Sequence, residues 1–322
     1  MDHLLLGKQD GLFFVLLMVQ TDRMYYIVFG ILFLISLLPL PVLYLLSYFC
    51  YFITYHVAGY RKEVVLKNLA LAFPEKTAAE RKEIAKQFYL NFWDNWLEAL
   101  KLISLSPGGM RKRMQYDTAA LESIFATGKS CHILLGHQFN WEWGNAIITL
   151  DGSYRLLAAY APISNKIFDR LFLYIRRRFG TTLLPFNDMR RAMLPFRHQQ
   201  YALALMADQS PPLPAKSYWL NFFNTPTAFL KGPEKGARLS NMPVVFLSIS
   251  KPRRGFYHIE TKLLTSNAAQ LAEGELTQKY VQALEANIRL NPACYLWSHN
   301  RWKHQWNGDY AKAWIGKAAP AN

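Results

Sequence analysis

The chain has 322 residues, of which 52% are hydrophobic, and its 37 Lys and Arg against 22 Asp and Glu give a formal net charge of +15. This composition excludes a disordered, collagen-like or low-complexity protein, and the length is ample for a buried core. The three cysteines, Cys50, Cys131 and Cys294, form no CxxC pair, which excludes a disulfide scaffold and a cysteine-rich zinc site. They favour a reducing compartment.

The charge is unevenly distributed along the chain. Residues 1–60 carry two basic and three acidic side chains, whereas the remainder carries 35 basic and 19 acidic ones. We expect such a basic body to bind polyanions, which could be nucleic acid, anionic lipid headgroups or an acidic carrier protein.

Residues 24–60 contain no Asp, Glu, Lys or Arg. As one helix they would be ~55 Å long, which exceeds the roughly 20 residues that one membrane span needs. Pro39 and Pro41 should kink or break this helix. The segment is therefore either one tilted span with an interfacial extension or a bent element that dips into one leaflet. A cleaved signal peptide is the alternative, but the run is long for one and no small-x-small cleavage site follows.

The predicted domains are a membrane anchor in residues 1–60 and one globular domain, large enough for an enzyme, in residues 61–322. Basic residues directly after the apolar run, Arg61, Lys62 and Lys67, place the second domain on the cytoplasmic side. Either Met1 or Met24 could be the true start.

The second domain opens with predicted helices over residues 61–103. The first ends at Pro74, and Thr77 with Glu80 predicts a capping box at the start of the second. Apolar runs then predict strands at residues 130–136, 155–161, 201–207, 244–250 and 256–264. Amphipathic stretches predict helices at residues 140–150, 164–179 (capped by Ser164), 187–199 (perturbed by Pro195), 233–239 and 277–290. The alternation predicts an α/β fold, with a mixed, partly parallel sheet flanked by helices and preceded by a hydrophobic membrane helix.

Residues 134–144 (Leu-Leu-Gly-His-Gln-Phe-Asn-Trp-Glu-Trp-Gly) are the most informative segment. His137 follows an apolar strand, and ligands bind at the carboxyl ends of strands in open α/β sheets. Glu142, at the start of the next helix, could curl back to the imidazole, fix its tautomer and leave the other ring nitrogen free to take a proton. A purely structural histidine at a strand end is the alternative that this spacing leaves open.

This segment resembles the His-x4-Asp/Glu motif of glycerolipid acyltransferases, most closely the late lipid A acyltransferases, which include lauroyl and myristoyl transferases. Further matching motifs follow in order between residues 25 and 306. They are Tyr160-x-Pro162-x-x-Asn165-x-x-x-Asp169 before Arg176, Arg177 and Arg178; Met206-Ala-Asp208-Gln209; Phe222-Phe223 with Thr227 and Gly232; and Pro292-x-x-Tyr295-x-Trp297-x-His299-x-Arg301-Trp302.

The resemblance implies that His137 is the general base and Glu142 its partner. It implies substrate-binding roles for five further residues, Arg176, Arg178, Asp208, Asn140 and Thr227. Two departures are visible. The loop after Asp208, Gln209-Ser-Pro-Pro-Leu-Pro214, differs from the family pattern, and the arginine triplet leaves the match open between Arg176 and Arg178.

The same resemblance implies an acyltransferase that moves a fatty acyl chain from an acyl carrier protein thioester to a hydroxyl of a lipid acceptor, foremost a lipid A precursor. No covalent acyl-enzyme, cofactor or metal is implied. The implied partners are acyl carrier protein, the lipid acceptor and anionic membrane lipid, without nucleic acid, at the cytoplasmic face of a bacterial inner membrane. Another bacterial lipid acceptor (a lysophospholipid, amino-acid lipid or glycolipid) stays open, as do the acyl length and the oligomeric state.

Rival functions lack support in the sequence. A serine hydrolase would need a G-x-S-x-G motif, which is missing. A metal hydrolase could use His132, His137 and Glu142, but zinc needs three convergent ligands, and the two imidazoles should point apart. No nucleic-acid-binding motif occurs. A non-catalytic membrane scaffold would keep its function in a His137→Ala variant.

Overall fold

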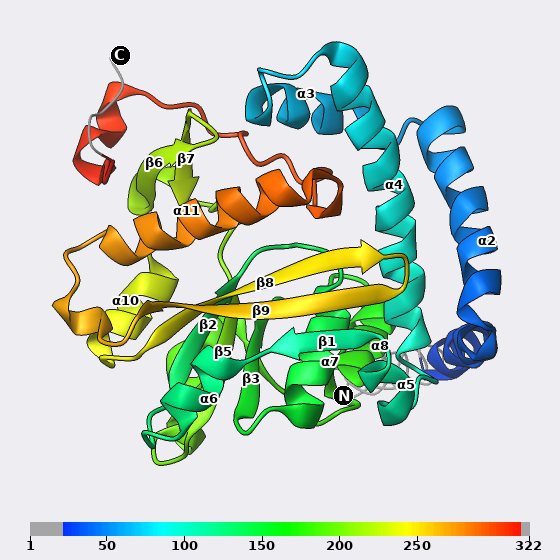
Figure 1. Cartoon of the computed structure of the whole chain (residues 1–322), viewed down its shortest axis with the longest axis horizontal. Coiled ribbons are helices and arrows are strands. Elements are labelled where there is room, and N and C mark those ends of the chain that lie inside the picture. Colours follow the sequence, from blue (N-terminus) through cyan, green and yellow to red (C-terminus); the bar gives the residue numbers. More distant parts are fainter. Residues whose placement is uncertain (1–21, 317–322) are drawn as a thin grey trace, which may run out of the picture.

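The computed structural model describes residues 22–316. Its centre is a seven-stranded sheet in the order β1-β9-β8-β2-β5-β3-β4 (Figure 1). Every neighbouring pair is parallel except β8 and β9, which form an antiparallel hairpin. The α/β fold and its mixed, mostly parallel sheet are therefore confirmed. The strands are β1 Met114–Asp117, β2 Cys131–Leu135, β3 Arg155–Tyr160, β4 Thr182–Pro185, β5 Tyr201–Met206, β8 Val244–Arg253 and β9 Phe256–Thr265.

Helices cover both faces of this sheet (Figure 1). The helices after the N-terminal region are α3 Lys62–Ala72, α4 Ala78–Lys101, α5 Pro107–Arg111, α6 Ala119–Phe125, α7 Trp141–Asp151, α8 Lys166–Arg177, α9 Met189–Ala192, α10 Gly232–Leu239 and α11 Glu275–Leu290. A separate two-stranded antiparallel sheet, β6 Tyr218–Phe222 and β7 Thr225–Phe229, lies beside α11. Figure 1 shows α11 crossing one side of the sheet, with α7 and α8 on the other side.

Strand β2 shows how its alternating residues serve two cores. Successive side chains of a strand point to opposite faces. Ile133 and Leu135 pack in the cluster that contains the apolar face of α7, whereas Leu134 packs in the cluster that contains the apolar face of α11. A strand that is buried on both faces is mainly apolar, which is why this run, apart from His132, has no polar alternation.

The sequence-based elements agree with the structure in most places and differ in a few. The capping box at Thr77 and Glu80 is present, with both reciprocal hydrogen bonds. Helix α8 is capped by Asn165 rather than Ser164, because the Asn165 side chain accepts from two backbone N–H groups. The single helix over 187–199 is wrong. The chain breaks there into α9 and two 3-10 turns, the second of which holds Pro195 near its start. Strands β1, β4, β6 and β7 were not predicted.

The N-terminal region is bent at the expected place. Residues 22–37 are helical, the helix stops before Pro39, and α2 Leu40–Phe52 continues through a π-helical turn at Ile53–Val57. Among residues 22–316, Leu40–Val57 is the one helical stretch long and apolar enough, by length and composition, to cross a membrane. Met1, the alternative start, lies outside the described residues.

Helix α2 packs along α4, and the two run side by side in Figure 1. Polar contacts join them: the Ser47 hydroxyl donates to Asp94 Oδ1 at 2.7 Å, and the Tyr44 hydroxyl donates to Glu98 Oε1 at 2.7 Å. The apolar helix is thus fastened to the body by buried carboxylates. A domain boundary at residue 60 stays a prediction.

Candidate active site at the carboxyl edge of the sheet

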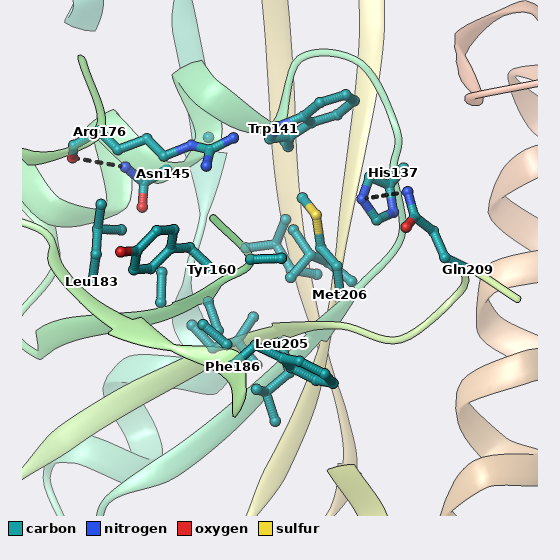
Figure 2. A pocket seen from close by; sticks show the side chains of 18 of the residues that line it. His137, Trp141, Asn145, Tyr160, Arg176, Leu183, Phe186, Leu205, Met206 and Gln209 are labelled. Carbon is teal, nitrogen blue, oxygen red and sulfur yellow. Dashed lines mark hydrogen bonds between the residues drawn. The ribbon is translucent and has the colours of Figure 1, made fainter. Parts of the chain in front are cut away.

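A cavity of about 430 Å³ lies between the sheet and helices α7 and α8. Most of its wall is apolar: Ile133, Leu135, Ile148, Leu156, Leu183, Met206, Leu247 and Ile249 are among the lining residues. In Figure 2, His137 and Gln209 lie toward one side of the view and Arg176, Asn145 and Tyr160 toward the other. An apolar cavity with a few converging polar groups is typical of a small-molecule or acyl-chain site.

Strand geometry brings His137 to this cavity. It follows Ile133 and Leu135 at even steps, so it continues their face of the sheet. The backbone approaches other groups closely here, since a Cβ on Gly136 would collide with Leu284 and lie 3.4 Å from Asp208 Oδ2. Glycine is therefore the residue that lets β2 end against α11 and β5.

The partner of His137 is Asp208, not Glu142. His137 Nδ1 lies 2.7 Å from Asp208 Oδ1, and the His137 backbone N–H donates to Asp208 Oδ2 at 2.8 Å. Each residue lies two positions beyond the last pair of the parallel strands β2 and β5, in which Leu135 pairs with Met206. The predicted hydrogen bond between His137 and Glu142 is thus wrong for this structure.

Asp208 is 1% exposed, yet its carboxyl is ionised. Burial opposes its ionisation, but the His137 imidazole, the two hydrogen bonds from His137 and the nearby Arg301 outweigh burial and hold the pKa of the carboxyl below its usual value. An ionised Asp208 accepts the Nδ1 proton and leaves the lone pair of His137 on Nε2. That ring nitrogen faces the cavity, and the Gln209 Nε2 atom lies 3.2 Å from it (Figure 2).

Glu142 lies on the cavity wall in an ion pair of its own. The Arg176 guanidinium donates from Nη2 to Glu142 Oε1 at 2.7 Å and from Nε to both carboxylate oxygens at 3.1 Å. Burial lowers the pKa of Arg176, but Glu142 more than restores it, so the pKa ends above its usual value. Trp141 Nε1 also donates to Glu142, at 3.1 Å. Arg176, one of the predicted substrate-binding residues, therefore lines the cavity. Glu142, the predicted catalytic carboxylate, holds it in place.

Comparison with known proteins decides the family. A family model described as "Bacterial lipid A biosynthesis acyltransferase" matches residues 16–304. The chain belongs to this family. "Lipid A biosynthesis acyltransferase 2" of Shigella flexneri is 22% identical over 233 residues, which are 71% of this chain and 74% of that protein. "Lipid A biosynthesis myristoyltransferase" of Escherichia coli (strain K12) is 25% identical over 166 residues, about half of each chain.

Because the chain belongs to the lipid A acyltransferase family, it is an acyltransferase, and this cavity is the candidate site of acyl transfer. The resemblance drawn from its motifs is therefore confirmed at the level of the family. At this edge of the sheet the His137 imidazole, paired with a carboxylate, lies beside an apolar cavity.

Three of the predicted substrate-binding residues lie away from the cavity. The guanidinium of Arg178 donates to the backbone carbonyls of Leu102 and Leu105 and so fastens α8 to the end of α4. Asn140 is fully buried as the N-cap of α7, and its amide donates to Glu98. The Thr227 hydroxyl donates to the Thr225 carbonyl and accepts from Trp302 Nε1. All three contacts hold the fold together. In this acyltransferase Arg176, not Arg178, is the arginine at the cavity.

The groups that a metal or thiol mechanism would need are not gathered at the cavity. His132 lies on the opposite face of β2 from His137, with its ring toward Gly236, and burial lowers its pKa to about 4. Within the part of the chain that the structure describes, no group of three or more His, Cys, Asp or Glu could hold a metal ion. Burial raises the pKa of Cys131 to about 12 and that of Cys294 to about 11, so both thiols are unreactive at neutral pH.

Gln209 and the pairing of Asp208 with His137 are the features that sequence reasoning missed. A signal for both existed: two apolar runs, 130–136 and 201–207, each end in polar residues. If the runs had been placed as neighbouring parallel strands, their carboxyl ends would have brought Asp208 and Gln209 to His137.

Proposed function

We propose that this protein transfers a fatty acyl chain from an acyl carrier protein thioester to a hydroxyl of a lipid A precursor, with His137 as the general base. The observation that carries the proposal is the contact of the His137 imidazole with buried, ionised Asp208, which turns the Nε2 lone pair to an apolar cavity. Asp208 is a positioning residue, because it acts on the substrate only through His137.

The proposed reaction has two proton transfers and no covalent enzyme intermediate. His137 Nε2 takes the hydroxyl proton while the hydroxyl oxygen attacks the thioester carbonyl carbon. The tetrahedral intermediate then collapses, the carbon–sulfur bond breaks, and the leaving sulfur takes the proton back from Nε2. The Asp208 carboxylate stabilises the imidazolium between the two steps. Such general-base catalysis typically contributes ~10²–10⁴-fold.

The cavity suits an acyl chain because its wall is mainly aliphatic. Each methylene that leaves water for such a wall contributes about 0.8 kcal/mol. Arg176 and Glu142 form a charged site in the same wall, and we assign them to the polar part of the donor or of the acceptor. The salt-bridged pair is rigid, so it can set the position of that polar group.

The proposed location is the cytoplasmic face of the bacterial inner membrane. The apolar Leu40–Val57 segment and the net charge of +15 support it, because a basic body beside a membrane helix attracts anionic headgroups and an acidic carrier protein.

A transfer assay with the full chain in membranes or detergent tests the proposal. Labelled acyl thioesters of acyl carrier protein are offered with a panel of hydroxyl-bearing lipids that includes lipid A precursors. We expect transfer to a lipid A precursor and its loss in a His137→Ala variant. An exposed histidine outside the cavity, His198, supplies the matched control His198→Ala. Full activity in the His137→Ala variant, or transfer to other lipids alone, would contradict the proposal.

A further inference from the structure

Gln209 covers the atom that the proposed reaction needs. Its side-chain Nε2 lies 3.2 Å from His137 Nε2 at the edge of the cavity (Figure 2). Because Asp208 takes the proton on Nδ1, His137 Nε2 carries a lone pair, and the Gln209 amide must be the donor in this contact. The free enzyme therefore holds its base hydrogen-bonded to an amide.

The backbone on both sides of Gln209 is fixed. Asp208 is held by the two hydrogen bonds from His137. The Ser210 N–H donates to His299 Nε2 at 2.9 Å, and the Ser210 hydroxyl donates to the Arg301 carbonyl at 2.6 Å. Burial, reinforced by Arg301, lowers the pKa of His299 to about 4, so His299 stays neutral and keeps accepting at physiological pH. Only the side chain of Gln209 is left free to move.

That side chain has no second anchor. Gln209 is exposed, and within residues 22–316 its amide makes no hydrogen bond other than that to His137. A neutral imidazole nitrogen has a single lone pair, so the amide and the acceptor hydroxyl cannot both bind it. The hydroxyl must take the place of the amide, about 2.8 Å from Nε2, and the amide must turn aside on its fixed backbone.

We infer that Gln209 is a further catalytic residue, whose displaced amide donates a hydrogen bond to the oxyanion of the tetrahedral intermediate. This inference rests on the proposed function. The hydroxyl oxygen bonds to the carbonyl carbon directly beside Nε2, so the carbonyl oxygen gains its negative charge two bonds away from the place that the amide has just left. The amide donates without losing a proton, and the oxyanion collapses as the carbon–sulfur bond breaks. The apolar wall of the cavity strengthens this interaction.

Two substitutions separate this role from packing. Gln209→Glu keeps the shape but replaces the donor with an acceptor, and Gln209→Ala removes the group. We expect kcat to fall by roughly 10²-fold in each, the usual effect of losing one oxyanion donor, with KM little changed. Gln270 is another exposed glutamine, outside the cavity, so Gln270→Glu is the matched control. Thermal unfolding of every variant checks that the fold is kept.

The outcomes are distinct from those of the proposed function. If His137→Ala is inactive and kcat of both Gln209 variants equals that of the wild type, the inference is overturned and the proposed function stands. A rise in KM alone would also overturn it, because Gln209 would then contact only the bound substrate. A rise in kcat would show that Gln209 only blocks His137 Nε2, and this too would overturn the inference. If His137→Ala retains activity, the proposed function is contradicted, and the inference that rests on it is contradicted as well.

Discussion

Two buried carboxyl groups contact the segment that carries His137, and their pKa values are shifted in opposite directions. Asp208, directly after β5, has its pKa lowered because His137 and Arg301 outweigh the effect of burial. Glu98, on α4, has its pKa raised because burial outweighs Lys251 and the hydroxyl donors around it. Both side chains are almost completely buried. Burial alone therefore does not decide the direction of the pKa shift, which also depends on the groups that face the carboxyl.

The difference in pKa shift goes with a difference in contacts. In the proposed reaction, ionised Asp208 stabilises the imidazolium of His137. Glu98 instead joins elements of the fold: Tyr44 of α2, Tyr257 of β9 and Asn140 at the cap of α7 all donate to it. That task needs hydrogen-bond acceptors and no proton transfer.

The largest effect should follow from removing the charge of Asp208. In Asp208→Asn the amide can donate to His137 Nδ1, which places the ring proton on Nε2 and removes the base. We expect kcat to fall by ~10³–10⁴-fold with the fold retained, by analogy with the aspartate of serine-protease triads. Steady-state transfer kinetics measure this loss, and Asp309→Asn at an exposed position is the control. A loss below tenfold would mean that Asp208 is only structural.

Breaking the pair of Glu142 and Arg176 should lower stability and also raise KM, because in the proposed function the pair positions the polar part of a substrate. Glu142 is 3% exposed, so Arg176→Gln leaves a buried carboxylate without its cation, a change that costs ~3–5 kcal/mol in comparable pairs. The double variant Arg176→Gln with Glu142→Gln should recover part of that free energy of unfolding, measured by denaturant titration. If instead Glu142→Gln loses as much kcat as Asp208→Asn, Glu142 contributes directly to catalysis.

His132 is a buried base that has no opposite charge facing it among the described residues. It is buried without a counter-charge, and its pKa is lowered to about 4, so the unfolded chain binds more protons than the folded one between pH 6.5 and 4. Stability should therefore fall as the pH drops through this window, by up to ~1.4 kcal/mol per pH unit and per histidine. His132→Leu should flatten that slope, and His299, which titrates in the same window, should preserve part of it. An unchanged slope in thermal unfolding from pH 7 to 4 would contradict this.

Glu98→Gln should have the smallest effect, because an amide of the same shape keeps a carbonyl oxygen that can accept from the surrounding donors. We expect the free energy of unfolding to change by about 1 kcal/mol or less and transfer activity to stay near that of the wild type. Glu98→Ala should cost more, since it leaves three buried donors without an acceptor. A large loss of activity in Glu98→Gln with the fold retained would show that Glu98 acts in catalysis, and the contrast with Asp208 would then be wrong.

The sequence predicted local features better than distant neighbours. The strand before His137, the helix after it and the capping box of α4 all follow from short patterns, and the structure has them. The partner of His137 does not follow from such a pattern. The spacing favoured Glu142, five residues away, but α7 begins at Trp141 and turns Glu142 toward α8, where Arg176 binds it. Asp208 reaches His137 because β2 and β5 are neighbours, although β3 and β4 lie between them in sequence.

The motifs predict substrate contacts for Arg178, Asn140 and Thr227, but in the structure these residues bind the backbone or neighbouring side chains. A motif shared with a family contains residues that build the fold as well as residues that act on the substrate. Only the direction of each side chain separates the two groups, and direction depends on the tertiary packing. Arg176 and Arg178, two residues apart on one helix end, illustrate this: one faces Glu142 and the other the end of α4.

The register that joins His137 to Asp208 has a consequence for refolding. The two residues are 71 positions apart, directly after the parallel strands β2 and β5, whose connection includes β3, α8 and β4. Contacts of such long sequence separation generally form late, because the loop must close before they contribute. Recovery of catalysis from denaturant should therefore lag behind recovery of helical signal and report directly on the alignment of β2 with β5.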